Sequence, residues 1–238
     1  MIYYLPIYFQ AIYGMSPSAS GIRSLPLILA MSIALLASST IVTWAGYFQP
    51  LLFIGGILLT VGSGMIYTLD GNSSPGQYIG YQILVGVGNG ICSQIPLIAS
   101  IAFAKPEDIP ITTSLVLCEY NACISLFLID SSAVFQLVSG AISVSLAQSL
   151  FANILISRIP IYAPTVDPAT VIAVGASELR NVFSPEELDG ILLAYMAGLK
   201  AAWAGGVGLA GLTLLVALIP KWKSIKNVSG KQNVVVVG

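Results

Sequence analysis

Residues 19–45 read ASGIRSLPLILAMSIALLASSTIVTWA, a run in which Arg23 carries the only formal charge. A helix of about 20 mainly apolar residues crosses the hydrocarbon of a bilayer, so this run is long enough to span. The pattern extends in both directions, because the sequence from Met1 to Ala104 holds just two charged residues, Arg23 and Asp70. Hydrocarbon admits apolar stretches and penalises ionised groups. This part of the sequence therefore predicts an integral membrane protein.

The composition of the whole chain agrees with this prediction and argues against several classes of function. Apolar residues make up 56% of the sequence and charged residues 8%, whereas a soluble domain has about a quarter of its residues charged. The net charge of −1 offers no basic stripe for nucleic acid. Histidine is absent, which removes the commonest general base and metal ligand. We therefore expect no enzyme activity, metal site, cofactor or nucleic-acid partner.

Turns rich in proline, glycine and polar residues divide the apolar sequence into predicted spans. These spans lie at about residues 1–13, 19–45, 51–69, 78–104, 111–157 and 201–219. At 1.5 Å per residue the stretch 1–13 is too short to cross, so we expect it to be the outer end of a truncated helix whose first part is missing. The run 111–157 is too long for one helix. The sequence predicts an all-α membrane domain over residues 1–220.

The distribution of lysine predicts how these spans are oriented. Four lysines lie in the tail 221–238, and the positive-inside rule places such a tail in the cytoplasm. Counting back through single crossings puts residues 158–200 and the loop 70–77 outside. Asn72 in that loop begins an Asn-Ser-Ser sequon, which makes it a candidate glycosylation site. Two crossings within 111–157 would reverse the orientation of everything upstream.

The outer segment 158–200 carries signals for the starts of helices. Asp167 and Ser184 each precede a proline, the arrangement of an N-cap residue followed by proline at the first helical position. Glu187 completes a capping box of the S-x-x-E type with Ser184. Apolar residues then recur at helical spacing. We expect an amphipathic helix that lies at the outer surface and runs on into the last span.

Several short motifs follow one another along the chain. They are YYLPIYFQA at 3–11, SGIRSLPL at 20–27, YIGYQILVGVGNG at 78–90, PED at 106–108 and SLAQ at 145–148. In this order they resemble the fungal 14-span drug/proton antiporters of the major facilitator superfamily (MFS). The resemblance covers nearly all of the chain but only the second half of such a transporter, its last six spans.

The resemblance implies a fold and a function. The fold is the six-helix C-terminal bundle of a major facilitator transporter, with its first helix truncated. The function is proton-coupled efflux of toxins, drugs or secondary metabolites across the plasma membrane, by two bundles that rock about a central cavity. The implied partners are the lipid bilayer, a small organic substrate, protons and the missing N-terminal bundle. One bundle is not expected to transport alone.

One stretch departs from the family pattern. In the family, the Thr-Ser-Leu-Val pattern is followed almost directly by Phe-Gln, whereas here the extra residues 118–134 separate them. These residues include Glu119 and Asp130. We interpret the stretch as an insertion, such as a retained intron would leave. The alternative hypothesis is a membrane re-entrant segment in which Asp130 serves as an intramembrane proton site.

A cavity for organic molecules needs polar groups on otherwise apolar helices, together with aromatic rings. The candidates are Tyr8, Gln10, Arg23, Gln82, Asn89 and Gln94. Arg23 either faces the cavity or extends to the outer interface, where its charge reaches water. Gln82 and Asn89 lie on one helical face, where a hydrogen bond between helices is the alternative explanation. Outside residues 118–134 no carboxylate lies in the middle of a predicted span, so proton coupling is expected to reside in the missing bundle.

Two further hypotheses compete with the transporter. A membrane enzyme is disfavoured by the absence of histidine and of paired catalytic groups. The other hypothesis is a non-transporting membrane protein that pairs with another half-transporter through small-residue faces on 51–69 and 78–104. In that second segment we expect Gly86, Gly88 and Gly90 to serve helix packing rather than ligand contact.

Overall fold

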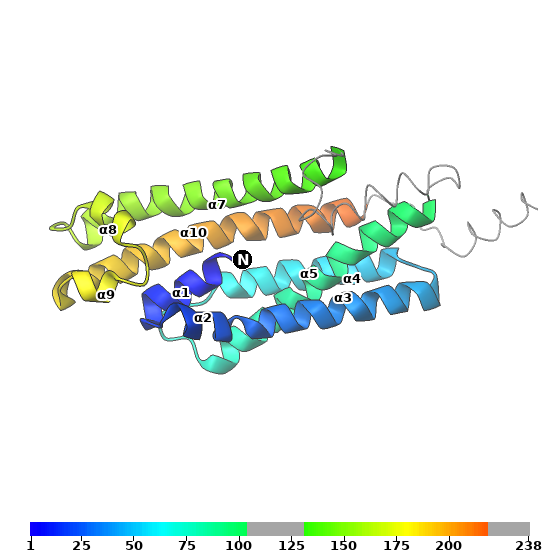
Figure 1. The fold of residues 1–238 in the computed structure, drawn as a ribbon, viewed down its shortest axis with the longest axis horizontal. Coiled ribbons are helices and arrows are strands. Elements are labelled where there is room, and N and C mark those ends of the chain that lie inside the picture. Colours follow the sequence, from blue (N-terminus) through cyan, green and yellow to red (C-terminus); the bar gives the residue numbers. More distant parts are fainter. Residues whose placement is uncertain (104–130, 219–238) are drawn as a thin grey trace, which may run out of the picture.

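The computed structural model describes residues 1–103 and 131–218, which Figure 1 shows as long helices running side by side. All regular secondary structure within these two ranges is helical, as the apolar pattern predicts. The elements are α1 (Tyr4–Tyr13), α2 (Pro17–Arg23), α3 (Leu25–Ala45), α4 (Gln49–Tyr67), α5 (Pro75–Phe103), α7 (Ser131–Tyr162), α8 (Pro168–Val174), α9 (Leu179–Val182) and α10 (Pro185–Ala217).

The predicted span 19–45 is present as the segment Pro17–Ala45, which is divided near its start into two helices. α2 ends at Arg23 and α3 begins at Leu25, with Ser24 between them. Pro26 lies in the first turn of α3. Because proline has no backbone N–H, it cannot donate the helical hydrogen bond to the residue four positions earlier, and the helix breaks there.

The outer segment and the last predicted span are joined in the structure. α10 is one unbroken helix from Pro185 to Ala217, whereas the sequence placed the span at 201–219. The predicted N-caps are present, since the Asp167 side chain accepts a hydrogen bond from the Thr170 N–H at 3.3 Å. At the start of α10 the Ser184 N–H and hydroxyl both donate to the Glu187 carboxylate, at 3.2 and 2.7 Å. The helix therefore begins where the capping signal predicts it.

Four helical segments within the described residues have the length and hydropathy to cross a membrane. They are Pro17–Ala45, Gln49–Tyr67, Gly140–Tyr162 and Pro185–Leu215. Their outward faces are apolar: on α3, Ile33, Leu36 and Trp44 are 67%, 69% and 83% exposed. Such large apolar side chains on the outside suit contact with lipid. The segment 118–130, with Glu119 and Asp130, the loop 105–110 and the tail 221–238 lie outside the described residues.

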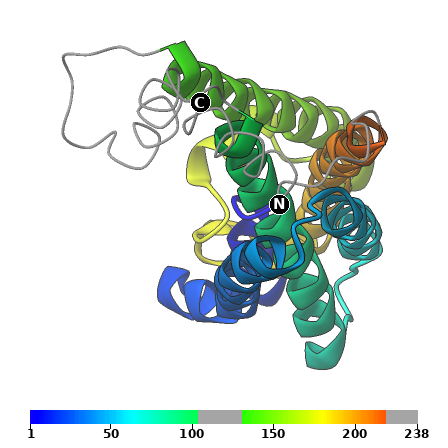
Figure 2. The ribbon, with the colours of Figure 1, turned by 90° about the vertical axis from the view of Figure 1, so that its right-hand side faces the viewer.

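The long helices pack in a defined order. α3 packs on α5, α5 on α4, α4 on α10 and α10 on α7, while α1 contacts α2 and α10. Figure 2 views this arrangement along the length of the molecule. α1 is short and lies at one end of the longer helices (Figure 1), where the loop 70–74 and α9 also lie.

Glycines on α5 allow its neighbours to approach closely. A Cβ added at Gly86 would lie 2.5 Å from the Leu27 carbonyl oxygen of α3. A Cβ added at Gly62 of α4 would lie 2.8 Å from the Val85 backbone nitrogen of α5. Real Cβ atoms do not come so close to backbone atoms, so these positions need glycine for packing. The predicted packing role of Gly86, Gly88 and Gly90 is confirmed, since each faces the backbone of a neighbouring helix.

Candidate functional site

Aromatic side chains bury α1 among the longer helices. Tyr8 and Phe9 are fully buried. The Tyr8 ring meets the Trp203 ring of α10 edge-on, with centroids 5.5 Å apart. The Phe9 ring meets the Tyr78 ring of α5 at 5.0 Å. α1 is therefore held between α5 and α10 by edge-to-face aromatic pairs, which favour such angles because ring edges are positive and ring faces negative.

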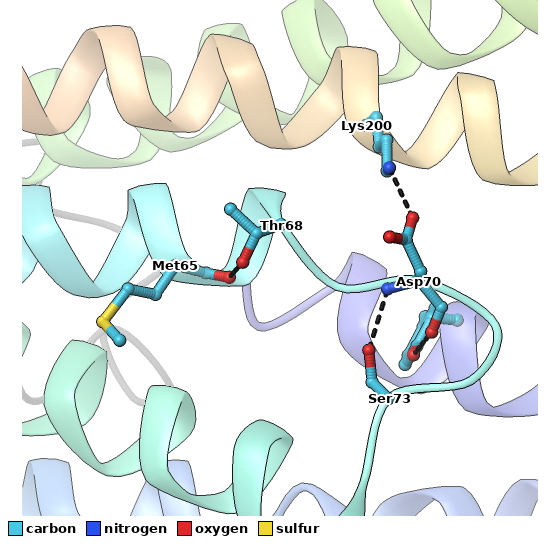
Figure 3. Close-up of polar contacts among 6 residues, drawn as sticks. Met65, Thr68, Asp70, Ser73 and Lys200 are labelled. Atoms are coloured by element: carbon cyan, nitrogen blue, oxygen red, sulfur yellow. Dashed lines mark hydrogen bonds and ion pairs between the residues drawn. The ribbon is translucent and has the colours of Figure 1, made fainter.

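Hydrogen bonds fix the C-terminal half of α1 to the loop 70–74, and an ion pair joins that loop to α10. The Tyr8 hydroxyl donates to the Asp70 carbonyl oxygen at 2.7 Å, and the Tyr13 hydroxyl donates to the Ser73 carbonyl oxygen at 2.8 Å. The Asp70 carboxylate pairs with Lys200 of α10 at 2.5 Å, and its backbone N–H donates to Ser73 Oγ (Figure 3). The loop thus connects α1 with α10.

A second cation acts on the end of α1 itself. Arg180 of α9 donates from Nη2 to the Ile12 carbonyl oxygen at 2.8 Å. Gly14 ends α1 with a positive φ of 63°, and a Cβ at this position would overlap the Arg180 side chain. Cations stabilise the carbonyl groups at the C-terminal end of a helix. Arg180 therefore caps α1 from the outer segment.

Arg23 lies beside aromatic rings from two other elements. Its guanidinium carbon is 5.9 Å from the centroid of the Tyr13 ring and 5.7 Å from the centroid of the Tyr78 ring. Both distances are those of cation–π contacts. One turn earlier on α1 and α2, Gln10 Nε2 donates to Ser20 Oγ at 3.0 Å. The structure thus brings Gln10 and Arg23 to the place where the C-terminal half of α1 meets α2.

The two polar candidates on α5 whose side chains are described lie further along that helix, and they differ in their hydrogen bonding. Gln82 is fully buried, and neither its amide nitrogen nor its amide oxygen has a hydrogen-bond partner among the described side chains. Asn89 donates from Nδ2 to the Met31 sulfur of α3 at 3.3 Å, a hydrogen bond between helices. The side chain of Gln94 lies outside the described part of the chain.

A groove opens where α1 begins. It has a volume of about 530 Å³. Its lining comes from α3, α4, α5, α7 and α10 as well as the first residues of the chain, and its polar members are Ser63, Asn89 and Thr213. The remaining lining is apolar. Of the predicted candidates whose side chains are described, only Asn89 lines this groove, because Tyr8, Gln10 and Arg23 lie toward the other end of α1.

Sequence patterns missed three residues that organise this site: Arg180, Lys200 and Trp203. Lys200 had a usable signal, since it is the one cation of α10 and lies next to the wholly uncharged second half of that helix. Tyr8, a predicted cavity residue, is engaged in packing and in its bond to Asp70. No group of three side chains able to hold a metal ion is found within residues 1–103 and 131–218.

Sequence comparison relates nearly the whole chain to fungal membrane proteins. It is 39% identical over 234 residues to the MFS-type transporter GME11371 of Pestalotiopsis microspora, which covers 98% of this chain and 40% of that protein. It is 38% identical over 227 residues to the efflux pump notK of an Aspergillus species (95% and 38% covered). It is 37% identical over 226 residues to the dehydrocurvularin exporter of Aspergillus terreus (94% and 37% covered).

The match covers only part of the length of each relative. The chain spans about two fifths of the length of the curated relatives it matches. No protein-family model and no solved structure matches it. The relatives confirm the resemblance to fungal efflux proteins that the motifs indicated.

Proposed function

We propose that this chain, which belongs over its own length to the fungal family of MFS-type transporters and efflux pumps, forms one helical bundle of an exporter of small organic molecules. The observation that carries the proposal is the match of 94–98% of the chain to proteins with those names. The exposed apolar faces of α3 support a location in the bilayer.

The proposed bundle has five spanning units in the order of the chain, preceded by α1 as the outer end of a sixth. The five are α2 with α3, α4, α5, α7 and α10. In this arrangement α8, α9 and the start of α10 lie on the outer side with Asn72, which stays a candidate for glycosylation. The tail 221–238 is cytoplasmic, and the membrane is the plasma membrane. The lysines of the tail support this orientation.

The second bundle of the proposed transporter comes from the rest of a family-length protein. The groove at Met1 supports this arrangement, because its lining is mostly apolar and five helices contribute to it. An apolar helix of the remaining part fits such a surface. The cavity for the substrate then lies between the two bundles, with Gln10, Arg23, Asn89 and Gln94 as its polar groups on this side, whereas Gln82 is buried within this bundle.

We also assign proton coupling to the part of a family-length protein that this chain does not cover. Each carboxylate of the described residues lies in the loop 70–77 or in the outer segment 167–189. A coupling group has to titrate within the membrane and to be reached from both sides in turn. The described carboxylates meet neither condition, so this chain by itself is expected to be inactive.

A chimaeric transporter tests the proposal. The part of the Pestalotiopsis relative that this chain does not match is fused to the chain and expressed in a yeast strain lacking its own drug exporters. Expression of the chimaera should lower the accumulation of a fluorescent dye, and a protonophore should restore accumulation. The chain alone, present in the membrane in equal amount, should change nothing. A chimaera that reaches the plasma membrane and exports none of a panel of dyes would refute the proposal.

A non-transporting partner for another half-transporter is the second candidate function. The groove at Met1 favours it, because a helix from a separate protein fits there as well as one from the same chain. Separate expression of this chain and of the unmatched part of the relative distinguishes the two. Recovery of export from the two separate chains supports a transporter made of two bundles. Stable association without export supports the pairing role.

A further inference from the structure

We propose that Arg23, held between Tyr13 and Tyr78, binds the anionic group of an exported compound, a carboxylate or a phenolate. This inference rests on the proposed transport function and names a class of substrate for it. Three elements meet at the guanidinium, since Arg23 ends α2, Tyr13 ends α1 and Tyr78 lies in the first turn of α5. Its distances to the two ring centroids are 5.9 and 5.7 Å.

The guanidinium is positioned but its hydrogen-bonding capacity is unused. Among the described side chains and backbone of residues 1–103 and 131–218, no carboxylate pairs with Arg23 and no acceptor receives its N–H groups. A guanidinium has five N–H donors in one plane, and contact with ring faces leaves that plane free. Arg23 thus presents a planar fork that matches two oxygens of a carboxylate.

The surroundings of Arg23 strengthen the interaction of its guanidinium with an anion. Arg23 is half-buried, and Tyr78 beside it is buried. The Tyr13 ring is fixed by the bond from its hydroxyl to the Ser73 carbonyl oxygen. Partial removal of water raises the strength of a charge–charge contact. The fixed rings also hold the guanidinium in place, so less side-chain freedom is lost when an anion binds.

The neighbouring polar pair marks the same surface. Ser20 precedes Arg23 by three residues on α2, and Gln10 precedes Tyr13 by three residues on α1. Residues three apart lie on one face of a helix, so the Gln10–Ser20 bond and the Arg23–Tyr13 contact follow the same seam between α1 and α2. The Ser20 hydroxyl itself donates to the Pro17 carbonyl oxygen at 2.8 Å, so this pair fixes the seam beside Arg23, and the guanidinium is the group that binds the anion.

A lipid phosphate shares this chemistry, because Arg23 lies near the proposed outer end of the spanning segment Pro17–Ala45 and phosphate oxygens also accept paired N–H groups. Extension of Arg23 to the lipid headgroups would place the guanidinium in the interface. The observed contacts with two rings on α1 and α5 instead direct it toward the bundle. The substrate anion is therefore the occupant we assign.

Binding of 2-naphthoate to the full 238-residue chain tests the assignment, with the uncharged methyl ester as the matched ligand. Affinities are measured by calorimetry in maltoside micelles, which contain no phosphate, and in phosphatidylcholine nanodiscs. Arg23→Gln should weaken naphthoate binding at least about tenfold in both settings, as expected for the loss of charge-assisted hydrogen bonds. Arg23→Lys, which keeps the charge without the planar fork, should weaken it less. The ester should not distinguish these variants from the parent.

Arg158→Gln, which removes an exposed cation of α7, is the matched control and should leave naphthoate affinity unchanged. Circular dichroism and gel filtration establish that each variant is folded. Equal naphthoate affinity for the parent and for Arg23→Gln overturns the proposal. The proposal is also overturned if naphthoate binding depends on Arg23 in micelles and is lost in nanodiscs, because the lipid phosphate then occupies the site. If the chimaera exports dye but the naphthoate affinity does not change in Arg23→Gln, this inference fails and the proposed transport function stands.

Discussion

At the scale of single residues, the structure is held around the C-terminal end of α1 by a few polar contacts between distant parts of the sequence. Asp70 and Lys200 are 130 positions apart, and Arg180 and Ile12 are 168 apart. Both contacts secure the region around the short helix α1. Their side chains are partly exposed, so each is expected to contribute modestly to stability.

The Asp70–Lys200 pair permits a quantitative prediction. Its side chains are 66% and 33% exposed, so water screens the attraction. We expect a double-mutant cycle with Asp70→Asn and Lys200→Met to give a coupling energy of about 0.2–1 kcal/mol from unfolding in maltoside. The coupling should fall as salt is added, because screening increases. Strictly additive single substitutions would show that the pair does not form.

Residue patterns predicted part of this region and could not predict the rest. The sequence singled out Arg23 because it is the one cation before Ala104, and the structure places that cation between two rings. The roles of Lys200 and Arg180 were missed. A helical pattern indicates which face of a helix is apolar, but it carries no information on which distant loop meets that face.

At the scale of the helices, the most extensive contacts are those of α5 with α3 and α4. Apolar runs predicted the presence of these helices, and glycine spacing predicted that α5 packs closely. The span predicted at 19–45 is present, and it is divided at Ser24 because Pro26 cannot donate a backbone hydrogen bond. The unbroken course of α10 was anticipated by the capping signal at Ser184, although the span itself was placed further along the chain.

Gly86→Ala should destabilise the bundle, because the new methyl group would lie 2.5 Å from the Leu27 carbonyl oxygen. Overpacking of this kind costs about 1–3 kcal/mol. Gly80→Ala is the matched control on the same helix, since nothing lies within 4 Å of its added Cβ. Thermal unfolding in maltoside should show a lower midpoint for the first variant and no loss for the second. Equal midpoints would mean that α3 and α5 are not packed as described.

Ser184→Ala should loosen the first turn of α10. The substitution removes the hydroxyl that donates to the Glu187 carboxylate at 2.7 Å. Loss of such a contact at a helix start typically costs about 1 kcal/mol. Hydrogen exchange at residues 186–189 should become faster, while Ser157→Ala, in the exposed part of α7, should leave that turn unchanged. Unaltered exchange in the first variant would argue against the cap.

At the scale of the whole molecule, the helices expose apolar surface and bury aromatic contacts around α1. The length and hydropathy of the described helices follow from the sequence alone. Their packing order does not, because apolar faces on several helices are interchangeable by pattern. The family match then relates this bundle to exporters that are about two and a half times as long.

Chemical labelling tests the proposed orientation. In a variant without native cysteines, Asn72→Cys should react with a membrane-impermeant maleimide in intact cells, because the loop 70–77 is placed outside. Tyr47→Cys, in the exposed turn after α3, should react only after permeabilisation. The reverse pattern would invert the orientation.

The central claim is that this chain supplies one bundle of a proton-driven exporter. Dye uptake into inside-out plasma-membrane vesicles that contain the chimaera measures it most directly, because uptake in that geometry corresponds to export. The account predicts that an imposed proton gradient, acidic inside, raises the initial rate several-fold over vesicles that contain this chain alone. Equal rates in the two preparations, with the chimaera present in the membrane, would contradict it.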